Sequence, residues 1–365
     1  MLGIKSINPM LECFSTLKEA GAYALFRLPD APYFTLVAQR KGDPLLFHNL
    51  KELNGESGFV IAPFKASEEQ PIVLIKCDIK KELPLSSLCE FANSEQIPIL
   101  LRYEREAYRN TFSVFSQALL KDEYQKLVLS RRAEAKAMFA PNPLTLFALA
   151  CQRYPHQAIT LSFTQPSGIW LVASPEVLLT GNHQQWSTVA LAGTMPYEQV
   201  QHTVTSNLWS PKNREEQQLV ADYIAQCLNH YAVDIKTEGP CTIQAGNLVH
   251  RSTTFQFTLL HLNQLGSLLA ALHPTPAVCG LPKKAAQQFI LRHETVSRHY
   301  YAGFMGLLQP EADTHLYVSL RCMQIKGEYL QFYAGGGLLK ASQEVDEWNE
   351  TEHKMDTMLS LFKQL

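Results

Sequence analysis

The sequence predicts an α+β fold rather than a doubly wound parallel sheet. Short runs of apolar and polar residues, separated by turn residues, recur along the chain and are typical of antiparallel strands. Helical patterns lie between these runs without a regular alternation of strand and helix. The 365 residues contain no short repeat, no low-complexity segment and no clear linker. We therefore expect one domain over residues 1–365, in which residues 1–104 join residues 105–365.

The first hundred residues are predicted to form strands. Their runs of apolar residues are YALFRL, YFTLVAQR, GFVIAPF and PIVLIKCDI. A helical pattern follows near residues 105–122, and the next predicted strand contains YQKLVLSR. A second helix is expected around PLTLFALACQRY, and it is followed by the strand patterns AITLSFT, GIWLVAS and QWSTVALAG.

Longer helical patterns occupy residues 213–231, 284–301 and 346–364. Strand patterns occur at TTFQFTLL, HLYVSLRCMQI and YLQFYAGGG. The glycines that end the last run open no helix of the kind that cradles a phosphate, so they are weak evidence for a nucleotide site.

The composition is ordinary for a globular protein and excludes several classes of partner. The net charge of −2 offers no basic excess for a nucleic-acid backbone. No apolar stretch approaches the roughly 20 residues that span a bilayer, and the first residues do not resemble a signal peptide. The eight cysteines are scattered, without a CxxC pair or a Cys/His cluster. We therefore expect a cytoplasmic protein without nucleic-acid or membrane partners.

Lys126 opens a strand-like run in which a charged side chain is unexpected. In an extended strand it shares one face with Val128 and Ser130, while Leu127 and Leu129 point to the other face. One interpretation is a lysine whose stem lies on the core while its ammonium reaches water. The other is a desolvated lysine that serves as a base.

Glu176 lies directly after the strand GIWLVAS, where Pro175 interrupts the ladder. A glutamate at such a corner is commonly a solvated side chain. Its apolar neighbours Val172, Val177 and Leu178 also allow a second interpretation, in which burial raises its pKa and it acts as an acid.

Two helical patterns carry further carboxylates. Glu216 falls on the apolar stripe of the helix at 213–231, where a buried glutamate needs a partner, and a metal ion is one option. Glu347 and Glu350 lie on the shoulder of the stripe of the last helix. Glu350 and Lys354 are also correctly spaced for an exposed i,i+4 salt bridge. The carboxylates of the two helices together would suit Mg²⁺.

The order of nine motifs along residues 105–365 resembles that of chorismate-utilising enzymes. The motifs are KLVLSR, ASPEVLL, ALAGT, KNREEQQLV, HPTPAVCG, RHYYAGFMG, VSLRC, YAGGG and EWNETEHKM. Within this superfamily the chain is most similar to isochorismate synthases of the menaquinone or siderophore type. The resemblance implies a single domain of two packed antiparallel sheets with outer helices.

The resemblance also implies roles for individual residues. Lys126 would activate the water that attacks C2 of chorismate, and it must be neutral to do so. Glu176 would protonate the departing C4 hydroxyl. Glu216 and Glu350 would bind Mg²⁺, with Glu347 close by or joined through water.

Both carboxylates of chorismate would be held by the remaining motif residues. The ring carboxylate would meet the metal and the backbone N–H groups near Gly193 and Thr194. Arg321 and Tyr301 would hold the enolpyruvyl carboxylate beside the backbone of Gly335, and a guanidinium can do so bidentately. Lys354 is expected near the metal-bound end.

The chain departs from the family pattern in three places. Asn213 stands where an acidic residue often precedes the metal glutamate by three positions, which makes the outer shell of the metal less negative. His299 replaces a frequent glutamate, and AGTMPY lacks the arginine that often follows AGT.

Other members of the superfamily remain alternatives. Salicylate synthases retain the lysine and the glutamate and then eliminate pyruvate. Aminodeoxychorismate synthases typically carry a nucleophilic lysine where this chain has Ala192, and anthranilate synthases generally lack the base lysine and take ammonia from an amidotransferase. We therefore expect no amidotransferase subunit, and we take a monomer as the working expectation. A catalytically inactive chorismate-binding protein is a further alternative. It would have no chemical need to retain five residues together, namely Lys126, Glu176, Glu216, Glu350 and Arg321.

Overall fold

A computed structural model describes residues 17, 19–92, 96–183, 185–197, 209–245 and 248–364. Its larger sheet is antiparallel, except that β20 runs parallel to β7, and β15 (Gly280–Leu281) pairs with the side of β8. The order of its other strands is β20 (Lys363–Gln364), β7 (Pro98–Arg102), β8 (Lys126–Ala137), β19 (Tyr329–Leu338), β18 (Cys322–Lys326), β10 (Gly168–Ser174), β9 (Ala158–Thr164), β1 (Ala22–Arg27), β2 (Tyr33–Gln39) and β6 (Ile79–Pro84).

The second sheet is antiparallel throughout its described pairs. Its order is β13 (Ala232–Ala245), β14 (Leu248–Leu259), β12 (Trp186–Pro196), β11 (Val177–Gly181), β17 (Thr314–Val318), β16 (Phe304–Leu308), β4 (Gly58–Ala62), β5 (Ile72–Ile75) and β3 (Leu45–Phe47). Strands from the first hundred residues enter both sheets, since β1 pairs with β9 and β4 pairs with β16.

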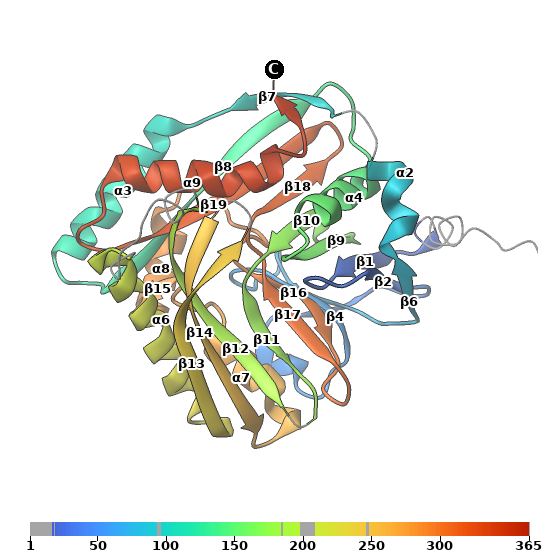
Figure 1. Ribbon diagram of the computed structural model, residues 1–365, viewed down its shortest axis with the longest axis horizontal. Coiled ribbons are helices and arrows are strands. Elements are labelled where there is room, and N and C mark those ends of the chain that lie inside the picture. The colour runs from blue at the N-terminus through green and yellow to red at the C-terminus, as the bar shows by residue number, and fades with distance from the viewer. Residues whose placement is uncertain are drawn as a thin grey trace, which may run out of the picture.

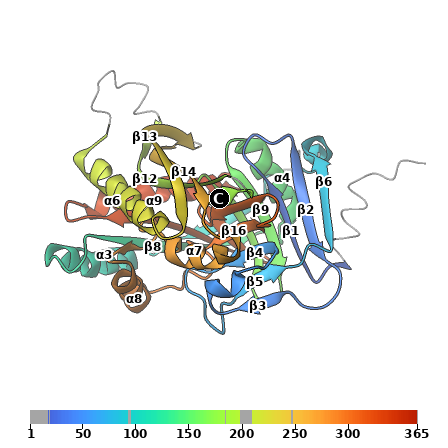
Figure 2. The ribbon, with the colours of Figure 1, turned by 90° about the horizontal axis from the view of Figure 1, so that it is seen from below.

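The described helices surround the sheets (Figures 1 and 2). They are α2 (Cys89–Ala92), α3 (Arg105–Leu120), α4 (Pro143–Arg153), α6 (Pro211–Leu228), α7 (Leu265–Leu272), α8 (Lys283–His293) and α9 (Glu344–Leu359), with short 3₁₀ turns at Leu50–Leu53, Leu85–Leu88 and Leu262–Gln264. Both views place α3, α6 and α8 at one end of the molecule and β1, β2 and β6 at the other. In the described part of the chain, no helix has the length and apolarity that crossing a membrane requires.

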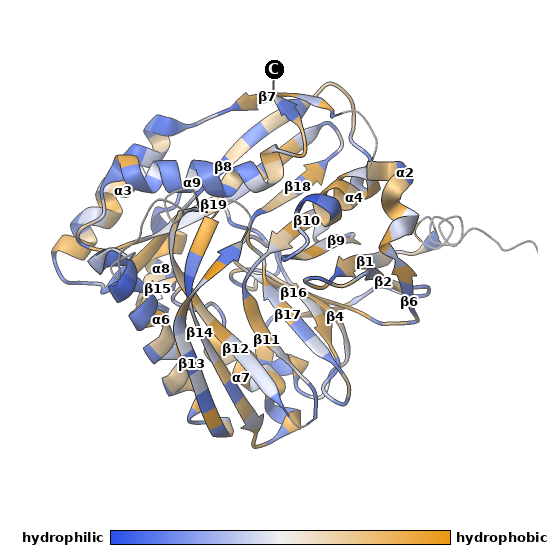
Figure 3. Ribbon diagram, in the orientation of Figure 1, coloured by the Kyte–Doolittle hydropathy of each residue, from blue (hydrophilic) through white to orange (hydrophobic). Residues whose placement is uncertain are grey.

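Strand alternation explains why the larger sheet is apolar on both faces. Along β10, Trp170 and Val172 face a core shared with the second sheet, while Leu171 and Ala173 face a core that includes residues of α4 and α9. The helices have to be apolar on one side only, and Figure 3 shows α6 and α9 in both colours. The predicted α+β fold of two packed antiparallel sheets with outer helices is confirmed.

The chain crosses from one sheet to the other at two neighbouring corners. Residues 175–176 join β10 of the larger sheet to β11 of the second, and residues 319–321 join β17 of the second sheet to β18 of the larger. The backbone N–H of Val318 donates to the carbonyl of Glu176 at 3.0 Å, and the N–H of Ala173 donates to the carbonyl of Arg321 at 3.1 Å. The two corners therefore lie side by side, and each carries a predicted site residue.

Three expectations about the elements are wrong. HLYVSLRCMQI is not one strand, because the chain leaves one sheet at Val318 and enters the other at Cys322. The helix expected at 284–301 ends at His293, because Glu294 is extended and its carboxylate contacts Arg298 and the N–H of Ser130.

The last helix, expected at 346–364, ends at Leu359. Leu361 and Phe362 then turn into the core, and Lys363–Gln364 pair with β7.

Candidate active site

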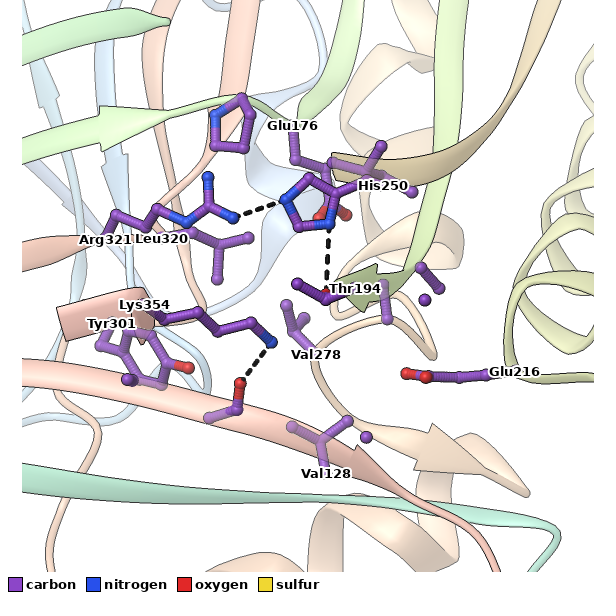
Figure 4. A pocket seen from close by; sticks show the side chains of 18 of the residues that line it. Val128, Glu176, Thr194, Glu216, His250, Val278, Tyr301, Leu320, Arg321 and Lys354 are labelled. Carbon is purple, nitrogen blue, oxygen red and sulfur yellow. Dashed lines mark hydrogen bonds between the residues drawn. The ribbon is translucent and has the colours of Figure 1, made fainter. Parts of the chain in front are cut away.

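A pocket opens beside the two corners, and it is also lined by Glu216 of α6 and Lys354 of α9 (Figure 4). All but three of the predicted site residues line it. Those lining it are Glu176, Gly193, Thr194, Glu216, Tyr301, Arg321, Gly335 and Lys354. The remaining three lie directly behind this lining. Lys126 contacts Glu216, Glu350 contacts Lys354, and Glu347 lies over Gly336.

Lys126 is fully buried, so the interpretation in which its ammonium reaches water is wrong. Its Nζ lies 2.9 Å from Oε1 of Glu216 on α6. Burial alone would raise the pKa of Glu216, but Lys126 and then Lys212 outweigh it and hold the pKa below its ordinary value. Glu216 is therefore a carboxylate at neutral pH, and the expectation that it faces inward is confirmed by its exposure of 7%.

The glycine run of β19 makes room for this pair. Gly337 lies opposite Val128 of β8, and a Cβ on it would lie 2.0 Å from Oε1 of Glu216 and 2.8 Å from Cε of Lys126. A Cβ on Gly335 would lie 2.7 Å from the hydroxyl of Tyr301. Glycine is required at these two positions because the side chains of Glu216, Lys126 and Tyr301 occupy the space that a Cβ would fill.

Glu176 is a buried acid. It is 3% exposed at the β10–β11 corner, and burial raises its pKa to about 8 although Lys126, Arg321 and Lys354 act in the opposite direction. The carboxyl group is therefore mostly protonated at neutral pH, and it can donate a proton to a group in the pocket.

Arg321 is held by a histidine that the sequence motifs did not single out. Its Nη2 donates to Nε2 of His250 at 2.6 Å, and Nδ1 of His250 lies 3.2 Å from the hydroxyl of Thr194 (Figure 4). Burial and the charge of Arg321 lower the pKa of His250 well below its ordinary value, so the ring is neutral. Since Nε2 accepts, Nδ1 carries the proton and donates to Thr194, whose own hydroxyl proton is left for a ligand.

Burial lowers the pKa of Arg321 to about 10, which still leaves the guanidinium charged at neutral pH. The backbone of Arg321 has φ of 46°, a conformation that most non-glycine residues avoid. The sheet crossing thus places a charged, buried guanidinium at the pocket, where an anionic ligand would be its natural partner.

Gly193 and Thr194 lie at a bulge of β12 against the first turn of α6. Gly193 has φ of 76°, and a Cβ on it would lie 3.0 Å from the carbonyl oxygen of Asn213. The amide of Asn213 donates to the carbonyl of Thr194 at 3.5 Å. Asn213, one of the departures from the family pattern, therefore joins the helix to the bulge. Residues 198–208, which follow the AGTMPY segment, lie outside the described residues.

Tyr301 and Lys354 complete the opposite wall. Tyr301 stacks on Tyr333 with ring centroids 5.6 Å apart, and burial raises the pKa of its hydroxyl so that it remains a neutral donor. The ammonium of Lys354 donates to the carbonyl of Gly335 at 2.9 Å and to Oε1 of Glu350 at 2.6 Å. The predicted Glu350–Lys354 pair is thus present, but it lies at the pocket rather than in open solvent.

Glu347 is the most buried carboxylate of α9, with 2% exposure. Its Oε1 forms an ion pair with Lys212 of α6, whereas its buried Oε2 makes no hydrogen bond of normal length. Burial and the neighbouring Glu350 raise the pKa of Glu347 to about 7, although Lys212 acts in the opposite direction. A Cβ on Gly336 would lie 3.0 Å from Oε2 of Glu347 and 3.8 Å from Oε1 of Glu350, so these two oxygens share one space above the strand.

This arrangement fits a cation without forming a finished site. Among the described residues, no three His, Cys, Asp or Glu side chains converge as a ready-made metal centre. Yet the unbonded oxygen of Glu347, the space over Gly336 and the hard carboxylate oxygens of Glu216 and Glu350 are what Mg²⁺ requires.

A sequence model of the family described as chorismate binding enzyme matches residues 65–363 of this chain. The chain belongs to this family. The isochorismate synthase EntC of Escherichia coli is 27% identical to it over 288 residues, which cover 76% of this chain and 73% of EntC. The isochorismate synthase DhbC of Bacillus subtilis is 30% identical over 271 residues, covering 70% and 67%.

The fold of this chorismate-binding enzyme is also that of a solved relative. A crystal structure of a 2,3-dihydroxybenzoate-specific isochorismate synthase, DhbC, from Bacillus anthracis superposes with a TM-score of 0.81 at 22% identity. The match covers 94% of this chain and 96% of that one.

Two residues that contact groups of the site in the chorismate-binding enzyme were missed by sequence reasoning. His250 lies just before the predicted strand pattern TTFQFTLL, and its partner Arg321 is 71 positions away. Lys212 is 135 positions from Glu347. The one local signal for Lys212 is its position in the first turn of a helix, where the helix dipole makes a cation unfavourable unless it has a partner elsewhere. His299, in contrast, lies outside the pocket lining and contacts Gln70.

Proposed function

We propose that the protein is an isochorismate synthase that converts chorismate reversibly into isochorismate. The observation that supports this most directly is the pairing of two buried groups at one pocket. Lys126 is a potential base on β8, and Glu176 is an acid whose pKa is raised to about 8. The reaction needs both, because water must lose a proton as the C2–O bond forms and the C4 hydroxyl must gain one as it leaves.

The proton balance closes over a full cycle. Lys126, which forms an ion pair with Glu216 in the free protein, has to be neutral when it takes a proton from the attacking water. Glu176 gives a proton to the departing hydroxyl, which leaves as water, and the proton gained by Lys126 then returns to Glu176 through solvent. The ring double bonds shift between the two carbons, and no oxidant or reductant is required.

The cationic wall of the pocket would hold the substrate. Arg321, oriented by His250, would bind one carboxylate, and the hydroxyl of Tyr301 could donate to the same group. Thr194 and the bulge at Gly193 would receive the other carboxylate at the end where Glu216 and Glu350 stand. Chorismate is a dianion, so anchors at both ends fix the ring between base and acid.

We further propose Mg²⁺ as the cofactor, held by Glu216 and Glu350 with Glu347 close by. The ion would supply positive charge for the ring carboxylate. The unbonded Oε2 of Glu347 and the space over Gly336 support a cation here. All described cysteines are free, which supports a reducing compartment, the cytoplasm, as the place of action.

Product analysis tests the reaction. Purified protein is incubated with chorismate and Mg²⁺, and products are separated by chromatography before mass spectrometry, because isochorismate and chorismate have equal mass. We expect isochorismate without release of pyruvate. Salicylate together with pyruvate would show a salicylate synthase instead, and unchanged chorismate would refute both. EDTA should abolish turnover and Mg²⁺ should restore it, and Glu216→Ala and Glu350→Ala should each lose activity while remaining folded.

A further inference from the structure

Each of the three carboxylates at the proposed metal site is paired with a lysine. Lys126 Nζ lies 2.9 Å from Oε1 of Glu216, and Lys354 Nζ lies 2.6 Å from Oε1 of Glu350. The third pair joins Lys212 to Oε1 of Glu347. Lys126 and Lys354 already have roles as base and substrate contact. Lys212 has no such role, although its partner, Glu347, is the most buried carboxylate of α9.

The position of Lys212 on its helix is unfavourable without this partner. It follows Pro211 in the first turn of α6, whose N-terminus is capped by Ser210. A cation in the first turn of a helix is destabilising, because the helix dipole is positive at that end. The side chain of Lys212 is nevertheless only 21% exposed, and it contacts Glu347 on another helix. Electrostatic attraction to α9 outweighs the local preference.

Lys212 satisfies only part of the carboxylate group. Its ammonium contacts Oε1 of Glu347, whereas Oε2 of the same residue makes no hydrogen bond within the described part of the chain. That free oxygen and Oε1 of Glu350 both face the position of a Cβ on Gly336. One monovalent cation therefore does not satisfy the group.

We propose that Lys212 is a built-in counter-ion that occupies the carboxylate group in the absence of metal and competes with Mg²⁺ for it. The inference rests on the proposed metal dependence. Mg²⁺ needs oxygen contacts of about 2.0–2.1 Å in a near-octahedral arrangement, which an ammonium on the same carboxylate obstructs by volume and by charge. The lysine keeps neighbouring carboxylates from repelling one another in the free protein, and it lowers the affinity of the site for metal.

The test is a thermal-unfolding titration with MgCl₂, using the full-length protein stripped with EDTA. Wild type is compared with Lys212→Met, which retains most of the stem, and with Lys212→Gln, which keeps a polar end. The shift of Tm with Mg²⁺ concentration gives the dissociation constant without any turnover. We expect both variants to bind Mg²⁺ at least about fivefold more tightly than wild type. We also expect a lower Tm in EDTA and a larger rise on adding Mg²⁺.

Lys340→Met is the matched control. Lys340 forms an ion pair with Asp122 in which both side chains are at least half exposed, away from the pocket. The same substitution there should leave Mg²⁺ binding unchanged.

Unchanged or weaker Mg²⁺ binding in both Lys212 variants overturns the proposal, and Lys212 then serves to position Glu347 for the metal. A wild-type protein whose Tm does not respond to Mg²⁺ overturns the proposal together with the metal dependence. These two failures are distinguished by the wild-type titration alone.

Discussion

The ammonium of Lys126 and the carboxylate of Glu216 form a buried ion pair 2.9 Å long across the strand position of Gly337. The proposed base is thus held by a side chain that is also a proposed metal ligand. The residue proposed to take the proton and a residue proposed to bind the metal are therefore in direct contact.

Replacing Lys126 tests the base directly. Lys126→Met keeps most of the apolar stem but removes the amine, so we expect kcat to fall by about 10²–10⁴-fold, as is typical for the loss of a positioned proton acceptor. Chorismate should still bind, because the proposed anchors for its carboxylates, Arg321 and the opposite end of the pocket, are unchanged. Steady-state kinetics and equilibrium binding of chorismate measure the two effects separately. Near-normal turnover in this variant would reduce Lys126 to a packing residue.

The acid should limit activity at high pH. Glu176 has a pKa raised to about 8, and only its protonated form can donate to the leaving hydroxyl. We therefore expect kcat/KM for chorismate to decline as the pH rises through about 8, and Glu176→Gln to be inactive while retaining substrate binding. A pH profile of kcat/KM on the wild type checks the first statement, and a flat profile up to pH 9.5 would contradict it.

Glu176 should also make the stability of the fold depend on pH, in the opposite sense to a carboxylate whose pKa is lowered by folding. Between its ordinary pKa of 4.5 and about 8, the native state binds more protons at Glu176 than the unfolded state does. Stability should therefore fall with rising pH in this window, and Glu176→Gln should remove that part of the decline. Denaturant titrations of both proteins at pH 5.5 and pH 8 provide the comparison.

Gly337→Ala should inactivate the protein without unfolding it. The added Cβ would lie 2.0 Å from Oε1 of Glu216, so the flexible end of that side chain must move and take its ion pair with Lys126 with it. Misplacement on the order of 1 Å can cost about 10²-fold in rate. Gly21→Ala is the matched control, because no atom lies within 4 Å of its Cβ position and its φ is not positive. Equal kcat in the two variants would argue against the role assigned to Gly337.

The buried pair of Arg298 and Glu294 should make a large contribution to stability at the first half of β8. Arg298 donates to the carbonyls of Val278 and Val128 at 2.7 and 2.8 Å, and Glu294 accepts the N–H of Ser130 at 2.7 Å. Arg298→Met leaves the carboxylate buried without its cation, which typically costs about 3–5 kcal/mol. Chemical denaturation measures the loss. Lys340→Met removes a surface ion pair and should cost at most about 1 kcal/mol; similar losses in both variants would contradict the assignment.

The first hundred residues are expected to be inseparable from the rest. Strands β1 and β4 pair with β9 and β16, so their removal would expose the edges of both sheets. Limited proteolysis followed by mass spectrometry should therefore yield no stable fragment that begins near residue 105. A folded fragment of that kind would show that the N-terminal part is a separate module.

Local sequence patterns correctly predicted the features that are determined by residues close together in the sequence. The inward position of Glu216 follows from the helical period of its neighbours, and the corner at Glu176 follows from Pro175. The break at Arg321 could not be predicted, because the apolar alternation of HLYVSLRCMQI continues through the residues at which the chain changes sheets. The edge strand β13 was missed because most of its side chains are exposed on both faces, which leaves no alternating pattern.

Long-range partners account for what the sequence did not reveal about the site. Nothing near His250 indicates Arg321, and nothing near Lys212 indicates Glu347, since each pair forms only when distant segments meet in the fold. The resemblance to a family proposed residues for the reaction. It did not show that the three proposed metal-binding carboxylates, Glu216, Glu347 and Glu350, each form an ion pair with a lysine.

The paired sheet crossings fix one distance in the pocket independently of the helices. Glu176 and Arg321 stand on two segments that are hydrogen-bonded together where the chain changes sheets, so their separation is set by the backbone of these two corners. Glu216 and Glu350 stand on α6 and α9 instead. The distance from either corner residue to these carboxylates therefore depends on how the two helices pack against the sheets.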